Sequence, residues 1–343
     1  MSNYMMFALT PTYMLILSLS INTESYMLFW LLLEMSSIII IIIMLVESLG
    51  KKSTKIIPFI TLIMNQVMTA TLLFMFLFIS NYNLSEESPI NFFICIVLMI
   101  KLGIYPFHKW YEYCITNMSW EMCMILSTAY KLMPFLFLDK ILSKDNEFMV
   151  AACLLSIFFT SLHVLKSKSI KELFAYSSMI HVNYMIILIH FDFFLWILYF
   201  FMYSMMVIHF CFFADQFKIS YQFDYFLLDN KSFYKLSMFF NNLAMASLPP
   251  FSTFFLKSAL FDEMILEYSF MFSILIFLLN IFTMLFYLLF SMPLVTTNNT
   301  SFNFTIALYQ LMGWDPKILV YLHLILMSSG PLLYLVVLLA SIQ

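Results

Sequence analysis

Long apolar runs, separated by short polar segments, make up nearly the whole of this 343-residue chain. Runs such as YMLFWLLLEMSSIIIIIIMLV are continuously apolar, with no alternation of polar and apolar residues. Such runs favour helices over membrane strands, because a spanning helix satisfies its own backbone hydrogen bonds. With about 20 apolar residues needed to cross roughly 30 Å of hydrocarbon, the pattern predicts an all-α polytopic membrane protein with about eleven transmembrane helices.

The predicted spans follow one another closely along the chain. We expect them at residues 5–22, 27–46, 56–80, 90–107, 118–138, 147–164, 171–191, 193–214, 234–267, 269–292 and 318–341. The segments between them are too short for a separate soluble domain, so residues 1–343 are interpreted as a single integral membrane domain.

Two of these spans are predicted to be broken at mid-membrane. In the fourth, Gly103 and Pro106 follow Lys101 in the motif KLGIYPFHKW, and in the ninth Pro249 and Pro250 stand at the middle. Proline removes a backbone donor and clashes with the preceding turn, so carbonyl groups of that turn are expected to be left free. Free backbone groups at membrane depth are tolerated where they are buried in protein or line a wet cavity. We therefore expect a water-filled path at the breaks.

The composition supports a membrane setting. Hydrophobic residues make up 63% of the chain and charged residues only 10%, which excludes an ordinary soluble domain. All 16 basic residues are lysines. No lysine precedes the first apolar run, so we expect neither a cleaved signal peptide nor an Arg-rich transit peptide. Nucleic acid is not an expected partner.

The lysines in the loops predict the orientation. When successive loops are assigned to alternate sides, one side receives only Lys140 and Lys144. The other side receives Lys51, Lys52, Lys55, Lys109, Lys166, Lys168, Lys171, Lys218, Lys231, Lys235 and Lys317. By the positive-inside rule this lysine-rich side, which also holds the N-terminus, is the cytoplasmic or matrix side.

Four ionisable residues lie within predicted spans: Glu34, Lys101, Lys131 and Lys257. A charge at the centre of a bilayer costs at least about 2.5 kcal/mol, so such residues usually face a bundle interior and serve ion or proton pathways. Simpler interpretations stay open. Lys101 could extend its ammonium group to the interface, and Glu34 could join helices. The presence of four such residues in one chain favours a pathway.

The histidines and cysteines limit which proton-relay, metal and cofactor sites the chain can form. His108, at the broken fourth span, and His181 are weaker candidates for a proton relay. There is no H-x-x-x-H or H-E-x-x-H pair, and the five cysteines form no C-x-x-C pair. The sequence also lacks a glycine-rich nucleotide-binding turn. We therefore predict that the chain itself binds no metal and no redox cofactor.

Five motifs are spread along the chain: WLLLEMSSI, KLGIYPFHKW, SWEMCMILSTAYKLMP, IKELFAYSSMIH and SLPPFSTFFLK. Together they resemble a family, the mitochondrially encoded subunit 2 of NADH:ubiquinone oxidoreductase, which is respiratory complex I. The resemblance covers an antiporter-like core at about residues 25–290. It implies an antiporter-like fold that lacks the first three helices of the bacterial form and has its N-terminus on the matrix side.

The resemblance also implies roles for single residues. Glu34 is similar to the family's fifth-helix glutamate, and Lys101 to its lysine partner on the first broken helix. Lys131 is similar to the central lysine of the hydrophilic axis, and Lys257 to the terminal lysine on the second broken helix. These four residues would form the axis along which protons are transferred.

Further expectations follow from the same resemblance. The chain would be a multi-pass subunit of the proton-translocating NADH:ubiquinone reductase in the mitochondrial inner membrane. Its partners would be subunits 4L and 4, accessory subunits and phospholipids such as cardiolipin. NADH, FMN, iron–sulfur clusters and ubiquinone would bind to partner subunits. One departure concerns the second break, where the family's glycines are missing, so Pro249 and Pro250 alone are expected to break the helix.

The mechanism that these residues favour is electrostatic coupling along the charged line. A carboxylate stabilises the charged form of a nearby buried lysine, so movement of Glu34 would change the proton affinity of Lys101, and Lys131 would respond. Two alternatives stay open. A stand-alone cation/proton antiporter would share the broken helices and buried lysines, whereas a scaffold would use its polar residues only to join helices.

Overall fold

A computed structural model of the chain describes residues 2–49, 57–82, 87–141, 147–167, 169–221, 232–249, 251–267 and 270–296. These residues are helical apart from turns and one isolated bridge between Ser169 and Tyr221. The all-α fold class is therefore confirmed for the described part. The chain divides into two compact units, Met1–Ala152 and Cys153–Gln343, which are described separately below.

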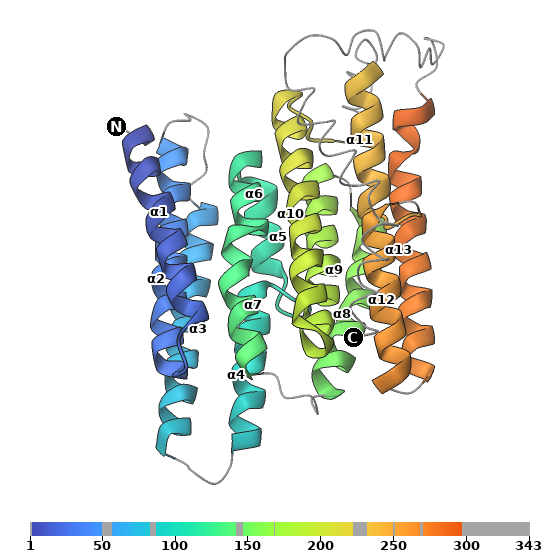
Figure 1. The fold of residues 1–343 in the computed structure, drawn as a ribbon. Helices are drawn as coiled ribbons and strands as arrows, with labels where there is room; N and C mark the ends of the chain where they lie inside the picture. Colours follow the sequence, from blue (N-terminus) through green and yellow to red (C-terminus); the bar gives the residue numbers. More distant parts are fainter. Residues whose placement is uncertain are drawn as a thin grey trace. The chain divides into compact units, whose positions relative to one another are not determined.

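The first unit is a bundle of antiparallel and broken helices (Figure 1). Helix α1 packs on α2, α2 on α3, and α3 on both α4 and α5, while α7 contacts α2, α4 and α6. Their bounds are α1 Ser2–Ile21, α2 Tyr26–Leu49, α3 Ile57–Tyr82, α4 Glu87–Leu102, α5 Lys109–Asn117, α6 Trp120–Ser127 and α7 Ala129–Ile141. Helix α8, Glu147–Lys166, crosses the boundary between the units.

The second unit is built around α9, which packs against α10 and α12. Helix α13 packs against α11 and α12 (Figure 1). The bounds are α9 Ile170–Phe191, α10 Phe193–Gln216, α11 Ser232–Met245, α12 Ser252–Glu267 and α13 Phe270–Thr296. Nearly every side chain of α9 is buried.

Local sequence signals explain where α9 and α10 begin. Ser169 accepts a hydrogen bond from the backbone N–H of Glu172, and the Glu172 side chain accepts one from the Ser169 backbone, which is a capping box. Asp192 then ends α9 and caps α10, accepting from the Phe194 backbone N–H at 2.9 Å. A single residue therefore joins two long helices and makes them antiparallel neighbours.

Seven helical segments within the described residues are long and apolar enough to cross a membrane. The predicted count of eleven spans stays a prediction, and the span expected at 318–341 lies outside the described residues. The span predicted at 118–138 agrees with one of these segments, Trp120–Ile141, although its helix is interrupted at Thr128. The residues that follow the fourth predicted span form a separate helix, α5.

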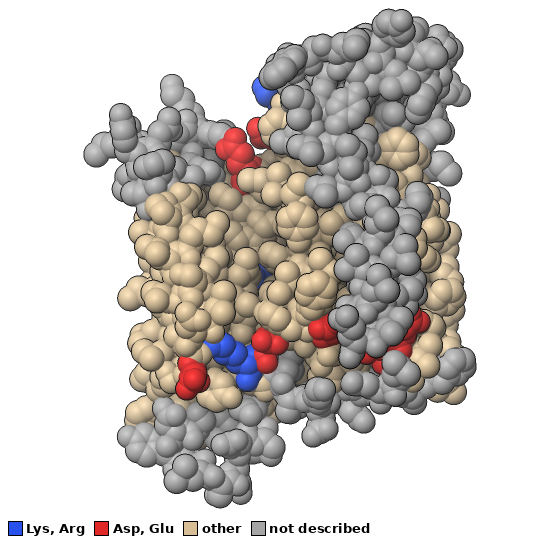
Figure 2. All heavy atoms as spheres, viewed as in Figure 1, with Lys and Arg blue, Asp and Glu red and all other residues tan. Residues whose placement is uncertain are grey.

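The outer faces of the helices are apolar. Large apolar side chains such as Met14, Leu15 and Met271 are more than half exposed. On the face shown in Figure 2, the middle of the described helices is almost entirely free of charge, and the Lys, Asp and Glu atoms gather toward helix ends. An apolar outer surface of this extent is expected for a protein in contact with lipid.

Candidate functional site

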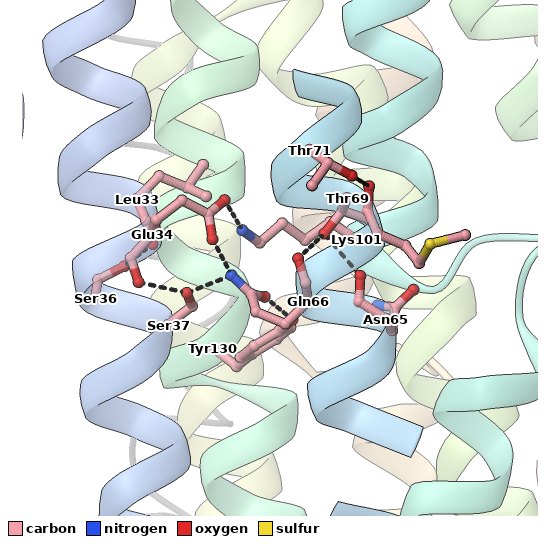
Figure 3. Close-up of polar contacts among 11 residues, drawn as sticks. Leu33, Glu34, Ser36, Ser37, Asn65, Gln66, Thr69, Thr71, Lys101 and Tyr130 are labelled. Atoms are coloured by element: carbon pink, nitrogen blue, oxygen red, sulfur yellow. Dashed lines mark hydrogen bonds and ion pairs between the residues drawn. The ribbon is translucent and has the colours of Figure 1, made fainter. Parts of the chain in front are cut away.

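Glu34 and Lys101 form a buried ion pair within the first unit (Figure 3). Glu34 lies on α2 and Lys101 in the last turn of α4, and Lys101 Nζ donates a hydrogen bond to Glu34 Oε1 at 2.8 Å. The side chain of Lys101 is 1% exposed and that of Glu34 is 13% exposed. The ammonium group therefore points into the bundle and has a carboxylate as counter-ion.

Gln66 of α3 completes the surroundings of the Glu34 carboxylate (Figure 3). Its amide nitrogen donates hydrogen bonds to Glu34 Oε2 and to Ser37 Oγ. Its amide oxygen accepts a hydrogen bond from the Tyr130 hydroxyl at 2.9 Å. Both carboxylate oxygens of Glu34 thus have a donor, one from a charged group and one from a neutral amide.

The first break directly follows Lys101. Gly103 has a left-handed backbone with φ 73°, its N–H donates to the Ile100 carbonyl at 3.1 Å, and the N–H of Ile104 donates to the Met99 carbonyl at 3.1 Å. This pair of bonds is the Schellman helix terminus. Trp110 also donates its indole N–H to the Ile100 carbonyl, at 3.0 Å. The expectation that carbonyl groups of this turn are left free was therefore wrong for these two carbonyls, because backbone and indole donors reach them.

The same glycine permits a close approach between the break and α5. A Cβ atom placed on Gly103 would lie 2.8 Å from Cβ of Tyr111, closer than real contacts allow. The ring of Tyr111 in turn lies under Lys131, whose Nζ is 4.2 Å from the ring centroid. The break thus positions an aromatic face against Lys131.

Lys131 lies on α7 and is 1% exposed. Among the described residues its Nζ has no hydrogen-bond partner, so the contact with the Tyr111 ring is a cation–π interaction without a counter-ion. Helix α7 begins two residues before it, at Ala129, since α6 ends at Ser127 and the Lys131 N–H donates to the Thr128 carbonyl at 3.1 Å. Tyr13 of α1 donates to the carbonyl of Ala129 at 2.7 Å, which fixes this first turn.

Lys257 lies on α12 in the second unit, 4% exposed, with its Nζ 4.2 Å from the centroid of the Tyr184 ring of α9. The helix before it ends in the same way as the helix at the first break, with a left-handed residue and a backbone hydrogen bond across the last turn. Ser247 is left-handed with φ 57°, and the N–H of Leu248 donates to the Leu243 carbonyl at 3.3 Å. Thr253 donates from α12 to the Ala244 carbonyl at 2.7 Å.

Helix α11 ends at Met245, before either proline. The expectation that Pro249 and Pro250 alone break this helix was therefore wrong, because Ser247 supplies the left-handed residue that glycine supplies at the first break. Pro250 itself lies outside the described residues. Whether either break lies at mid-membrane stays a prediction.

The two histidines occupy different surroundings. His108 precedes α5, is 3% exposed, stacks on Tyr105, and has its Nδ1 3.2 Å from the Pro106 carbonyl. His181 on α9 is 1% exposed, with Nδ1 2.8 Å from the Tyr199 hydroxyl. His181 stands one helical turn before Tyr184, so it shares a helix face with the aromatic partner of Lys257. A relay role for either histidine stays a prediction.

The structure thus groups the predicted residues by unit. Glu34, Lys101, Lys131 and His108 belong to the first unit, and His181 and Lys257 belong to the second. No three His, Cys, Asp or Glu side chains within the described ranges lie close enough to share a metal ion.

Sequence reasoning missed the neutral residues that surround the predicted site residues. They are Gln66, Tyr111, Tyr130, Tyr184 and Tyr199. A polar residue within the apolar run IPFITLIMNQVMTATLLF could have pointed to Gln66. The tyrosines carried no signal of their own, since the chain contains 20 of them.

A family model described as NADH:quinone oxidoreductase/Mrp antiporter, transmembrane, matches residues 7–283. The chain belongs to this family. The chain is similar to NADH-ubiquinone oxidoreductase chain 2 of Anopheles gambiae, with 32% identity over 185 residues, 53% of this chain and 54% of the relative. The match therefore spans about half the length of that relative. With chain 2 of Artemia franciscana the identity is 28% over 239 residues, 70% of this chain and 74% of the relative. The resemblance inferred from the motifs is confirmed.

The fold of this NADH:quinone oxidoreductase/Mrp antiporter family member is also similar to a solved structure, that of respiratory complex I from Thermus thermophilus with bound aureothin. The TM-score is 0.75 and the sequence identity 17%, and the match covers 90% of this chain and 74% of the other. At that identity the likeness shows the fold alone. It agrees with the antiporter-like architecture predicted from the motifs.

Proposed function

We propose that this chain is a membrane-arm subunit of NADH:ubiquinone oxidoreductase and carries protons across the mitochondrial inner membrane. The observation that carries the proposal is the buried Glu34–Lys101 ion pair, together with a second buried lysine, Lys131, in the same unit. Family membership and the relatives named NADH-ubiquinone oxidoreductase chain 2 support the setting.

The proton chemistry of the chain resides in its lysines. The carboxylate of Glu34 stabilises the ammonium form of Lys101, so withdrawal of that carboxylate favours release of the proton. Lys131 faces the Tyr111 ring and no carboxylate among the described residues, so its charge depends on its neighbours and on entering water. Lys131 would therefore be the acceptor for a proton released at Lys101, because its protonation state changes readily. Lys257 would store a proton in the second unit.

The redox chemistry belongs to partner subunits in this proposal. NADH, FMN, iron–sulfur clusters and ubiquinone would bind there, and the energy released would reach this chain through neighbouring membrane subunits. Those neighbours would include subunits 4L and 4, accessory subunits and phospholipids such as cardiolipin. The excess of lysine on one side of the predicted topology supports an N-terminus on the matrix side.

One other function fits the same family. A stand-alone cation/proton antiporter is favoured by the second half of the family's description, Mrp antiporter. The two functions differ in assembly, since the first requires a large NADH-oxidising complex and the second does not.

The deciding experiment separates gently solubilised native membranes on a native gel. The gel is stained for NADH dehydrogenase activity, and each band is searched for peptides of this chain by mass spectrometry. We expect the peptides in the large NADH-active band. Peptides found only in a small, inactive band would overturn the proposal and favour the antiporter.

A further inference from the structure

Gln66 stands between two charged regions of the first unit. It lies on α3, contacts Glu34 and Ser37 on α2, and contacts Tyr130 on α7 (Figure 3). Tyr130 is followed directly by Lys131, the lysine without a hydrogen-bond partner among the described residues. One neutral side chain therefore connects the ion pair with the helix that carries the next lysine.

The orientation of the Gln66 amide is fixed by its neighbours. Ser37 donates its hydroxyl hydrogen to the Glu34 backbone carbonyl at 2.7 Å, so its oxygen is free to accept from Gln66. The carboxylate of Glu34 accepts from the same amide nitrogen, while the phenol of Tyr130 donates to the amide oxygen. Reversal of the amide would place its oxygen against the carboxylate oxygen, which is repulsive. The amide therefore suits the ionised form of Glu34.

Gln66 is also buried, being 5% exposed. A buried amide that uses both N–H donors and its oxygen is expensive to disturb, because any lost partner leaves a desolvated polar group. This cost holds the Glu34 carboxylate in place, with Oε1 at 2.8 Å from Lys101 Nζ.

We propose that Gln66 is a positioning residue that holds the Glu34 carboxylate against Lys101 and links that pair through Tyr130 to the helix bearing Lys131. When Glu34 gains a proton on Oε2, the new O–H is a donor toward Gln66, and the Gln66 amide turns to offer its oxygen. The turned amide then presents N–H to the Tyr130 oxygen. The state of the ion pair is thereby transmitted to the residue next to Lys131. The inference rests on the proposed proton-carrying function.

The test compares variants of Gln66 in the assembled complex, in membrane vesicles. Gln66→Leu keeps the volume but removes donors and acceptor, and we expect NADH-driven proton pumping per NADH oxidised to fall about tenfold, with normal assembly on a native gel. Thr69→Val is the matched control. Thr69 lies one turn further on α3, fully buried, and its hydroxyl bonds to the carbonyls of Asn65 and Gln66. We expect the control to pump like the parent.

A pH profile separates positioning from packing. In Gln66→Glu the introduced carboxyl group, when protonated, keeps the acceptor and one of the two donors of the amide, and when ionised it repels Glu34. Pumping relative to the parent should therefore recover as pH falls, whereas Gln66→Leu should show no recovery. The titratable groups in contact with Gln66 are Glu34 on α2 and Tyr130 on α7. Beyond them, Lys101 on α4 contacts Glu34, and Cys114 on α5 contacts Thr61 of α3.

The outcomes are distinct. Pumping by Gln66→Leu within about twofold of the parent, well short of the loss expected for a buried bond to a charged group, would overturn the inference. An equal, pH-independent loss in Gln66→Glu would also overturn it. If Gln66→Leu fails to assemble, Tyr130→Phe replaces it, with an expected loss of about threefold for one hydrogen bond. If Lys101→Met also pumps like the parent, the proposed function itself fails, which distinguishes the two.

Discussion

Lys101 and Lys131 are equally buried in the same unit, yet their surroundings differ. Lys101 has a carboxylate at 2.8 Å, and that carboxylate has a further donor in Gln66. Lys131 faces an aromatic ring at 4.2 Å and has no hydrogen-bond partner within the described residues. A cation–π contact supplies about 0.5–2 kcal/mol, against several kcal/mol for desolvating an ion. The comparison indicates that the surroundings of Lys101 stabilise its charged form, whereas Lys131 can gain or lose its charge readily.

The largest expected effect comes from breaking the pair. Glu34→Leu leaves the ammonium of Lys101 buried without its counter-ion, and should destabilise the chain by about 3–5 kcal/mol. The double variant Glu34→Leu/Lys101→Met should recover most of this loss, because no charge is left buried. The measurement is the temperature at which the chain is lost from the assembled complex.

Lys131→Met tests the contrast between the two lysines in the same thermal measurement. Since it removes a buried charge that has no counter-ion among the described residues, it should leave the stability unchanged or raise it. A loss as large as that of Glu34→Leu would mean that Lys131 has an anionic partner, and the distinction between the two lysines would fail.

A smaller effect is expected at the breaks that adjoin the lysines. Gly103→Ala forces a left-handed residue and a Cβ contact at 2.8 Å with Tyr111, and should cost at least about 1–2 kcal/mol. Ser247→Gly is the matched variant at the second break, where it relieves a left-handed serine and should stabilise by up to about 1 kcal/mol. Heat inactivation of the complex measures both. Equal responses of the two variants would contradict the strain assigned to these positions.

The sequence predicted the parts of the fold that depend on hydropathy. Long apolar runs such as 171–191 and 193–214 agree closely with α9 and α10, because burial in lipid or protein selects the same residues. It did not predict the interruption at Thr128 or the helix Lys109–Asn117, since neither interrupts or extends an apolar run. At the second break the sequence pointed only to prolines, whereas the helix there ends at the left-handed residue Ser247. At the first break the left-handed residue is Gly103, which the sequence had indicated together with Pro106.

The candidate site shows the same division. Buried charges are conspicuous in an apolar sequence, so Glu34 and Lys101 could be found and even paired through the resemblance. Their neutral partners could not, because a tyrosine or glutamine becomes informative only when folding places it against a charge. Tyr111 of α5 meets Lys131 of α7 only once the helices have packed, and no spacing in the sequence encodes that contact.

The most direct test of the account is proton pumping by Lys131→Met in vesicles that contain the assembled complex. Lys140→Met is the matched control on the same helix, where the Lys140 ammonium donates to the Ser20 carbonyl at 3.1 Å and caps α1. We predict that Lys131→Met lowers pumping per NADH oxidised by at least about tenfold, as loss of a proton-transfer group does. The Lys140→Met complex should pump normally. Normal pumping by an assembled Lys131→Met complex would contradict the account.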